Sequence, residues 1–218
     1  AGISSMVGTT IEWYDFFIYG AAAALIFNKL FFPNLDPLTG VLAAFGTYAV
    51  GFIGRPLGGL VFGHFGDKIG RKSMLLLTLM LMGIPTVLIG LLPTYESIGY
   101  WAAICLVILR FIQGMAMGGE WGGAVLMAVE HAPEGKKGFW GSLPQASTGG
   151  GLMLASIALG LVSLLPEQAL FSWGWRIPFL ASIVLLAVGW YIRVKVPESP
   201  DFEKVKEQAE NIKVPALQ

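Results

Sequence analysis

Charge, cysteine and catalytic motifs are all scarce in this sequence, and each scarcity excludes a class of protein. Only 13% of the 218 residues are charged, against 55% that are hydrophobic, and the mean hydropathy is +0.69. This composition excludes a water-soluble domain and indicates an integral membrane protein. The single cysteine, Cys105, excludes an internal disulfide network and reads as a small buried hydrophobic residue. A net charge of zero gives no reason to expect a nucleic-acid partner.

Motifs for chemistry are missing as well. The sequence has no Cys/His spacing typical of a metal site, no nucleophile elbow and no phosphate-binding loop. We therefore expect neither an enzyme nor a protein that carries a cofactor or a metal.

Long apolar runs, in contrast, are abundant. Six are long enough to cross the roughly 30 Å hydrocarbon core of a bilayer as helices. They cover approximately residues 3–29, 40–62, 73–92, 98–128, 139–164 and 173–194, and turn-forming residues separate them. The predicted fold class is an all-α membrane protein, with a six-helix transmembrane bundle over residues 1–196 and a cytoplasmic linker over residues 197–218.

The positions of the basic residues predict how this bundle is oriented, because cytoplasmic loops carry an excess of Lys and Arg. Lys29 and Arg176 fall at one end of the predicted helices, and ten basic residues fall at the other. The ten are Lys68, Arg71, Lys72, Lys136, Lys137, Arg193, Lys195, Lys204, Lys206 and Lys213. We therefore expect both ends of this segment to be cytoplasmic.

Residues 63–72 read Gly-His-Phe-Gly-Asp-Lys-Ile-Gly-Arg-Lys and lie between the second and third apolar runs. An Asp flanked by glycines and followed by basic residues predicts a tight turn at a charged surface. Positive-inside bias alone makes such turns basic, but the fixed spacing here resembles the loop between helices two and three of the major facilitator superfamily. We expect the residues of this motif to form a conformational gate: Gly63, Asp67, Lys68, Gly70, Arg71 and Lys72.

Five charged residues fall well inside the predicted helices, away from their ends, where burial costs several kcal/mol each: Glu12, Asp15, Arg55, Arg110 and Glu120. Glu12 and Asp15 are three residues apart and share a helical face with Tyr19. Neighbouring carboxylates in an apolar setting suit a proton carrier. The alternative is a permanent pairing with an Arg that only locks helix packing.

The two arginines lie in glycine-rich helices. A planar guanidinium holds a carboxylate with two hydrogen bonds, so Arg55 is expected either to anchor an organic anion or to pair with one of the buried acids. Arg110, Gln113 and Glu120 share one arc of the fourth predicted helix, with Trp121 beside them. Glycines near them predict a helix-packing seam, and a further polar position is expected in the fifth helix. These residues are Gly54, Gly58, Gly114 and Gly118 for the seam, and Gln145 in the fifth helix.

Four motifs, in order on four helices, carry a more specific resemblance. They are Glu-Trp-Tyr-Asp-Phe at 12–16, Phe-Ile-Gly-Arg-Pro-Leu-Gly-Gly at 52–59, Gly-Gly-Glu-Trp-Gly at 118–122 and Trp-Gly-Trp-Arg-Ile-Pro-Phe at 173–179. Together they resemble the metabolite:proton symporter family of the major facilitator superfamily, along essentially the whole chain. The Arg-x-x-x-Gly-x-x-x-Gly run at 110–118 is similar to a fourth-helix pattern of that superfamily whose Arg is associated with proton coupling.

This resemblance implies both architecture and function. It implies two inverted three-helix repeats that form one half of a transporter and pair with a C-terminal half, the alternative being a six-helix protein that dimerises. Family members include carriers of shikimate, 2-oxoglutarate, citrate and proline or betaine. We therefore expect proton-coupled symport of a small carboxylate or zwitterion across a bacterial inner membrane by alternating access. The rival hypotheses are a proton-independent facilitator and a non-transporting membrane sensor or scaffold.

Overall fold

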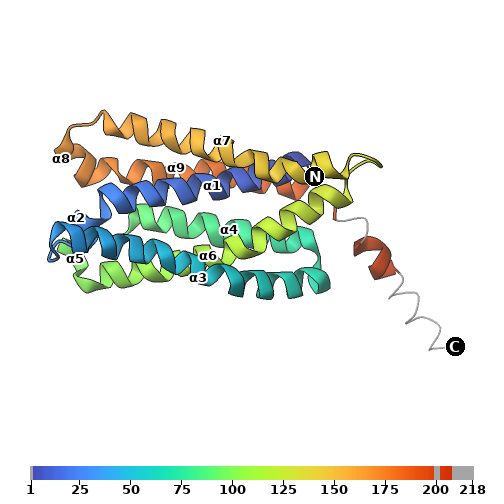
Figure 1. Cartoon of the computed structure of the whole chain (residues 1–218), viewed down its shortest axis with the longest axis horizontal. Coiled ribbons are helices and arrows are strands. Elements are labelled where there is room, and N and C mark those ends of the chain that lie inside the picture. The colour runs from blue at the N-terminus through green and yellow to red at the C-terminus, as the bar shows by residue number, and fades with distance from the viewer. Residues whose placement is uncertain (1, 199–201, 208–218) are drawn as a thin grey trace.

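The structure, a computed structural model, describes residues 2–198 and 202–207. Within this part of the chain six long helices lie side by side along one axis (Figure 1). They are α1 (Gly2–Leu25), α3 (Pro37–Ile69), α4 (Arg71–Leu91), α6 (Tyr100–Glu130), α7 (Lys137–Ser163) and α9 (Arg176–Lys195). Short elements join them at one end: α2 (Phe27–Phe31), α5 (Tyr95–Ile98), α8 (Glu167–Ala169) and the π-helical turn η1 (Leu170–Gly174).

Five of the six long helices, all except α1, are long and apolar enough to cross a membrane. α1 has 24 residues, but its polar side chains lower its mean hydropathy. Those side chains are buried against the other helices: Ser4, Ser5, Thr9, Glu12 and Asp15. The polar face of α1 is therefore turned into the bundle, and α1 packs with the other five long helices.

The helix boundaries differ most from the predicted ones at two places. The first run is interrupted at Ile26, so that α1 and the short α2 replace a single helix over residues 3–29. α3 continues through residue 69, and the turn expected over residues 63–72 consists of Gly70 alone. Gly70 has a φ of 114°, a conformation that L side chains rarely adopt. The motif residues thus lie in the last turns of α3 (Gly63, Asp67 and Lys68) and the first turn of α4 (Arg71 and Lys72).

The structure describes only part of the predicted linker. Residues 197 and 198 follow α9, and residues 202–207 are helical. Residues 199–201 and 208–218, which include Lys213, lie outside the described residues.

The start of α3 shows a conventional N-terminal cap. Pro37 occupies the first turn, and the Asp36 carboxylate accepts a hydrogen bond from the Thr39 amide at 3.1 Å. Hydrogen bonding from Thr39 lowers the pKa of Asp36. This cap fixes where α3 begins at the end of the bundle that carries the short helices (Figure 1).

Helix packing follows the internal symmetry of two three-helix repeats. α3 packs on α6 and α1 on α7, while α4 contacts both α6 and α9, and α1 contacts α9. In the two repeats α1 corresponds to α6, α3 to α7 and α4 to α9. The α3–α6 contact is therefore equivalent to the α1–α7 contact, and the α4–α6 contact to the α1–α9 contact. The architecture is that of the six-helix half predicted from the sequence.

An aromatic cluster fills the bundle at the end with the short helices. Phe27 and Phe31 of α2 pack edge-on against Trp175, with ring centroids 6.1 and 6.0 Å away, and Phe179 stacks on Phe27. Tyr19 of α1 joins them through an edge contact with Phe27. All five rings are at most 2% exposed, so α2 and the C-terminal part of α1 pack tightly on the start of α9.

Candidate functional site

The site begins with a close contact between α3 and α6. A β-carbon at Gly54 would lie 2.8 Å from the carbonyl oxygen of Phe111, closer than real β-carbons come. At three other glycines of the seam it would overlap backbone atoms of the facing helix: Gly58, Gly114 and Gly118. Only glycine allows two backbones this near, and the approach brings the side chain of Arg55 against α1 and α6.

α1 and α6 run in opposite directions, so their polar groups meet at successive levels through the bundle. At the first level Ser5 donates a hydrogen bond to the Ala124 carbonyl at 2.9 Å. The next three levels each contain one buried carboxylate, and we call them the Glu120, Glu12 and Asp15 levels.

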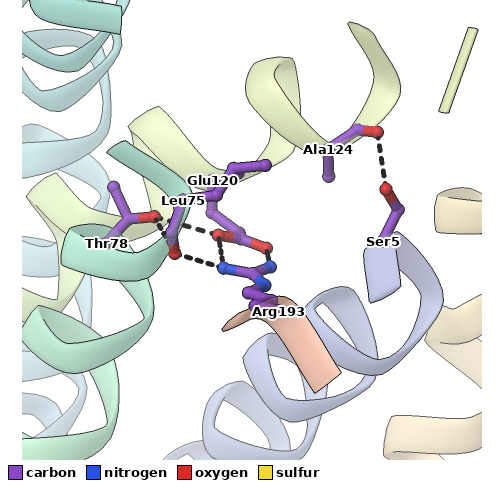
Figure 2. Close-up of polar contacts among 6 residues, drawn as sticks. All are labelled: Ser5, Leu75, Thr78, Glu120, Ala124 and Arg193. Atoms are coloured by element: carbon purple, nitrogen blue, oxygen red, sulfur yellow. Dashed lines mark hydrogen bonds and ion pairs between the residues drawn. The ribbon is translucent and has the colours of Figure 1, made fainter. Parts of the chain in front are cut away.

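At the Glu120 level a bidentate ion pair lies inside the bundle. Arg193 of α9 donates to both carboxylate oxygens of Glu120, with an Nη1 to Oε2 distance of 2.9 Å, and Thr78 of α4 donates to Oε2 at 3.0 Å. Arg193 Nη1 also donates to the Leu75 carbonyl, as Figure 2 shows. Glu120 is 0% and Arg193 3% exposed. This arrangement ties together α4, α6 and α9.

α1 packs against this ion pair at Gly8, a residue without a side chain. A β-carbon at Gly8 would lie 2.6 Å from Glu120 Oε1 and would overlap the Arg193 guanidinium. From the sequence, Arg55 is a candidate partner of Glu120, and Arg193 is predicted to lie among the basic residues at the cytoplasmic end. The structure corrects this, because Arg193 is buried in the bundle rather than free at its surface.

At the Glu12 level the ion pair is looser. Arg55 Nη2 lies 3.8 Å from Glu12 Oε1, and the Arg55 side chain is 30% exposed while that of Glu12 is 4% exposed. The guanidinium lies 5.5 Å from the Phe16 ring and 5.1 Å from the Phe52 ring, and 3.7 Å from the Met117 sulfur. Oε2 of Glu12 is buried and has no hydrogen-bond partner among the described residues.

At the Asp15 level neutral groups surround the carboxylate. Thr86 of α4 donates to Oδ2 at 2.8 Å, and Ser182 of α9 donates to Oδ1 at 3.0 Å. Gln113 donates to the Thr86 hydroxyl at 2.6 Å and accepts from Arg110 at 3.3 Å. A continuous hydrogen-bonded chain therefore runs from Arg110 to Asp15 through two uncharged side chains.

Arg110 itself is buried between aromatic rings. It is 1% exposed, and its guanidinium lies 4.4 Å from the centre of the Tyr19 ring and 4.8 Å from that of Tyr48. The Tyr19 hydroxyl shares a hydrogen bond of 2.6 Å with Thr47 of α3. The two rings provide cation–π stabilisation where no carboxylate lies within ion-pairing distance among the described residues.

Two residues expected near this cluster lie away from it. Gln145 is exposed on α7. Trp121, which the helical wheel placed beside Glu120, is 53% exposed on α6, whereas Arg110, Gln113 and Glu120 are buried. A rise of one residue past Glu120 rotates the side chain by about 100°, which is enough to turn it out of the bundle.

The motif over residues 63–72 contributes to a separate charged group at the opposite end from the short helices. Arg71 pairs with Glu130 at the end of α6, and the Lys72 amide donates to the Glu198 carboxylate at 3.0 Å. Asp67 is exposed at the rim of a hollow of about 180 Å³ between α3, α4 and α6, whose walls are largely glycine.

Four partners of the buried charges were not predicted from the sequence: Thr78, Thr86, Ser182 and Arg193. Each of the three hydroxyl residues is an isolated polar residue in an apolar stretch, a signal that usually reflects a bond to the helix's own backbone. Among the described residues, no group of three or more His, Cys, Asp or Glu could hold a metal ion.

Comparison with known proteins places the chain in a family. A sequence model described as "Sugar (and other) transporter" matches residues 2–213. The chain belongs to this transporter family. It is 53% identical over 94% of its length to the shikimate transporter of Escherichia coli K12, covering 47% of that protein. It is 47% identical over 98% of its length to the inner membrane metabolite transport protein YhjE of the same strain, covering 49% of it.

Among solved structures, the inward-open xylose transporter XylE from E. coli has the same fold. The TM-score is 0.79 at 21% identity, over 97% of this chain and 50% of that one. The chain thus spans about half the length of the relatives it matches. The predicted membership of the major facilitator superfamily and the predicted half-transporter fold are confirmed, and the family is one of transporters rather than enzymes.

Proposed function

We propose that this chain is the N-terminal half of a secondary active transporter that couples proton entry to uptake of a small organic acid or zwitterion. The observation that carries the proposal is Arg55, a cation that is buried on one side by Glu12 and open on the other. An organic carboxylate that reaches this surface would find a planar donor and the faces of Phe16 and Phe52 beside it. The relative named a shikimate transporter carries a solute of this chemical class.

The coupling follows from carboxylates that share the core with arginines. Protonation of a carboxylate in the cluster Glu12, Asp15 and Glu120 removes a negative charge and releases an Arg to take the anion of the solute. Proton and solute then cross together by alternating access, in which one half rocks against the other. A proton-independent facilitator needs no buried acids, and a sensor needs no cation open to a solute.

The second half and the gate complete this proposal. A C-terminal half of the same transporter would supply the other wall of the cavity. The exposed carboxylate of Asp67 and the neighbouring basic groups of the motif would form contacts with that half in one conformation and lose them in the other. By the positive-inside rule this end of the bundle is cytoplasmic, in a bacterial inner membrane.

Labelled uptake into proteoliposomes tests the function. The full-length transporter is reconstituted, the interior is made alkaline, and shikimate, 2-oxoglutarate, citrate, proline, betaine and xylose are supplied one at a time. We expect one carboxylate or zwitterion to accumulate, and a protonophore to abolish its accumulation. Uptake that ignores the pH gradient would indicate a facilitator, and no uptake of any solute would favour the sensor.

A further inference from the structure

We infer that Glu12 is the residue that binds the transported proton, and that Arg55 is the cation it releases to the solute. This inference rests on the proposed function and names the coupling pair within it. Asp15 and Glu120 then act as positioning residues that hold α1 and α6 around the pair.

The geometry of Glu12 differs from that of the other two buried acids. Its Oε2 has no hydrogen-bond partner among the described residues, so a proton can bind there without breaking an existing bond. Its only ion partner in the described structure is Arg55 at 3.8 Å, beyond hydrogen-bonding distance. Protonation at this residue therefore disrupts one weak contact.

Asp15 and Glu120 are bound much more completely. Both oxygens of Asp15 accept hydrogen bonds, from Thr86 and Ser182. Both oxygens of Glu120 accept from Arg193, and one also accepts from Thr78. A proton on either residue would compete with hydrogen bonds that together join three helices.

The three arginines near these carboxylates also differ, in how far each is exposed to solvent. Arg110 and Arg193 are 1% and 3% exposed, so a solute could reach them only if the helices came apart. The Arg55 side chain is 30% exposed. Arg55 is thus the one cation of the three that both contacts a buried carboxylate and lies open to a solute.

The charged groups that act on Glu12 lie on four helices. They are Asp15 on α1, Arg55 on α3, Glu120 on α6 and Arg193 on α9. Glu120 and Arg193 neutralise each other, and the Asp15 level lies one turn away along α1. The charge of the Arg55 pair therefore changes mainly with the proton on Glu12.

Charge balance then explains why proton and solute cross together. In the empty site the Glu12 carboxylate and the Arg55 cation sum to zero. When a proton binds at Oε2 and a solute of net charge −1 binds the guanidinium through its carboxylate, the sum is again zero. A site with only the proton, or only the solute, holds one uncompensated buried charge, which costs several kcal/mol and opposes the conformational change. On the far side the solute leaves, the proton dissociates and the ion pair re-forms.

The test is the variant Glu12→Gln in the full-length transporter, reconstituted in liposomes with the membrane potential clamped at zero. The wild type should accumulate its solute about tenfold per pH unit if one proton is coupled, because one pH unit corresponds to about 1.36 kcal/mol. In the Gln variant the site is neutral when the solute is bound, but it carries the uncompensated charge of Arg55 when it is empty. Only the loaded form should therefore change conformation, and we expect exchange of labelled for unlabelled solute without accumulation. The matched control Glu134→Gln, exposed in the turn between α6 and α7, should behave like the wild type.

Accumulation by Glu12→Gln equal to that of the wild type overturns the inference while leaving symport intact. Absence of pH-driven accumulation in the wild type instead removes the proposed function on which it rests. Asp15→Asn and Glu120→Gln should keep a solute-to-proton ratio equal to that of the wild type at whatever rate they retain.

A second measurement needs no variant to fold. Dicyclohexylcarbodiimide reacts with protonated carboxyl groups in apolar surroundings, and mass spectrometry locates the adduct. We expect wild-type protein to be labelled at Glu12, and the labelling to fall as the pH rises. Labelling at Asp15 or Glu120 with Glu12 unmodified, or no labelling of Glu12 at any pH, contradicts the assignment.

Discussion

Replacing Arg193 by Met removes the cation that neutralises Glu120 and leaves a carboxylate inside the bundle. Glu120 is 0% exposed, and the donor that remains to it in the described structure is the Thr78 hydroxyl at 3.0 Å. The Met side chain fills most of the volume of the lost stem, so packing changes little. The free energy of unfolding should therefore report the loss of charge compensation.

The expected loss for Arg193→Met is about 3–5 kcal/mol, the range for removing one partner of a buried ion pair. Replacing both partners, as in Glu120→Leu with Arg193→Met, removes the orphaned charge together with its partner. The double variant should recover to within about 1 kcal/mol of the wild type or exceed it, because two desolvated charges give way to apolar contacts. The difference between single and double variants measures the coupling of the pair.

Unfolding of the full-length protein in detergent micelles, followed by circular dichroism, measures these free energies. Lys195→Met is the matched control, since Lys195 is exposed at the end of the same helix and its loss should change stability by about 0.5 kcal/mol or less. An Arg193→Met variant as stable as the control would refute the reasoning. A double variant no more stable than the single one would show that the pair is not what ties these helices.

Three further predictions test other parts of the structure. Gly58→Leu should separate α3 from α6 and lower stability by about 1–3 kcal/mol or more, whereas Gly122→Ala, which meets nothing within 4 Å, should not; equal unfolding midpoints would contradict the close seam. Arg55→Lys keeps the charge but loses the fork, so solute affinity should fall about 10- to 100-fold in a binding assay, and unchanged affinity would remove Arg55 as the anchor. Tyr19→Phe deletes the 2.6 Å hydrogen bond to Thr47 and should lower the unfolding free energy by about 0.5–1.5 kcal/mol; a more stable variant would contradict it.

The helices and the polar positions were accessible from the sequence because membranes restrict what an apolar run can do. Each backbone polar group in hydrocarbon must be bonded within its own helix, so a run of about 20 apolar residues has few alternatives. The same restriction makes Glu12, Asp15 and Glu120 conspicuous. Their positions on one side of α1 and of α6 followed from helical periodicity, and the structure buries all three.

The pairing among these charges was not accessible in the same way. Periodicity gives the face of a helix but not which helix lies opposite, so Arg55 had three acids as alternatives and the structure places it near Glu12. Arg193 follows an apolar stretch and stands two residues from Lys195, which is the pattern of a loop charge. Only the packing of α9 against α4 and α1 turns it inward. The predicted length of the turn over residues 63–72 was wrong for a related reason. A glycine-rich polar sequence can continue a helix when a single glycine at positive φ, here Gly70, ends it.

The most direct test of the central claim is proton movement driven by solute. The full-length transporter is sealed in liposomes that contain a pH-sensitive dye, with no pH gradient imposed, and each organic acid or zwitterion is added outside. Symport predicts that one class of solute acidifies the liposome interior. The Glu12→Gln variant should bind the same solute without acidifying the interior. Uptake of that solute by the wild type with no change in internal pH would contradict proton coupling.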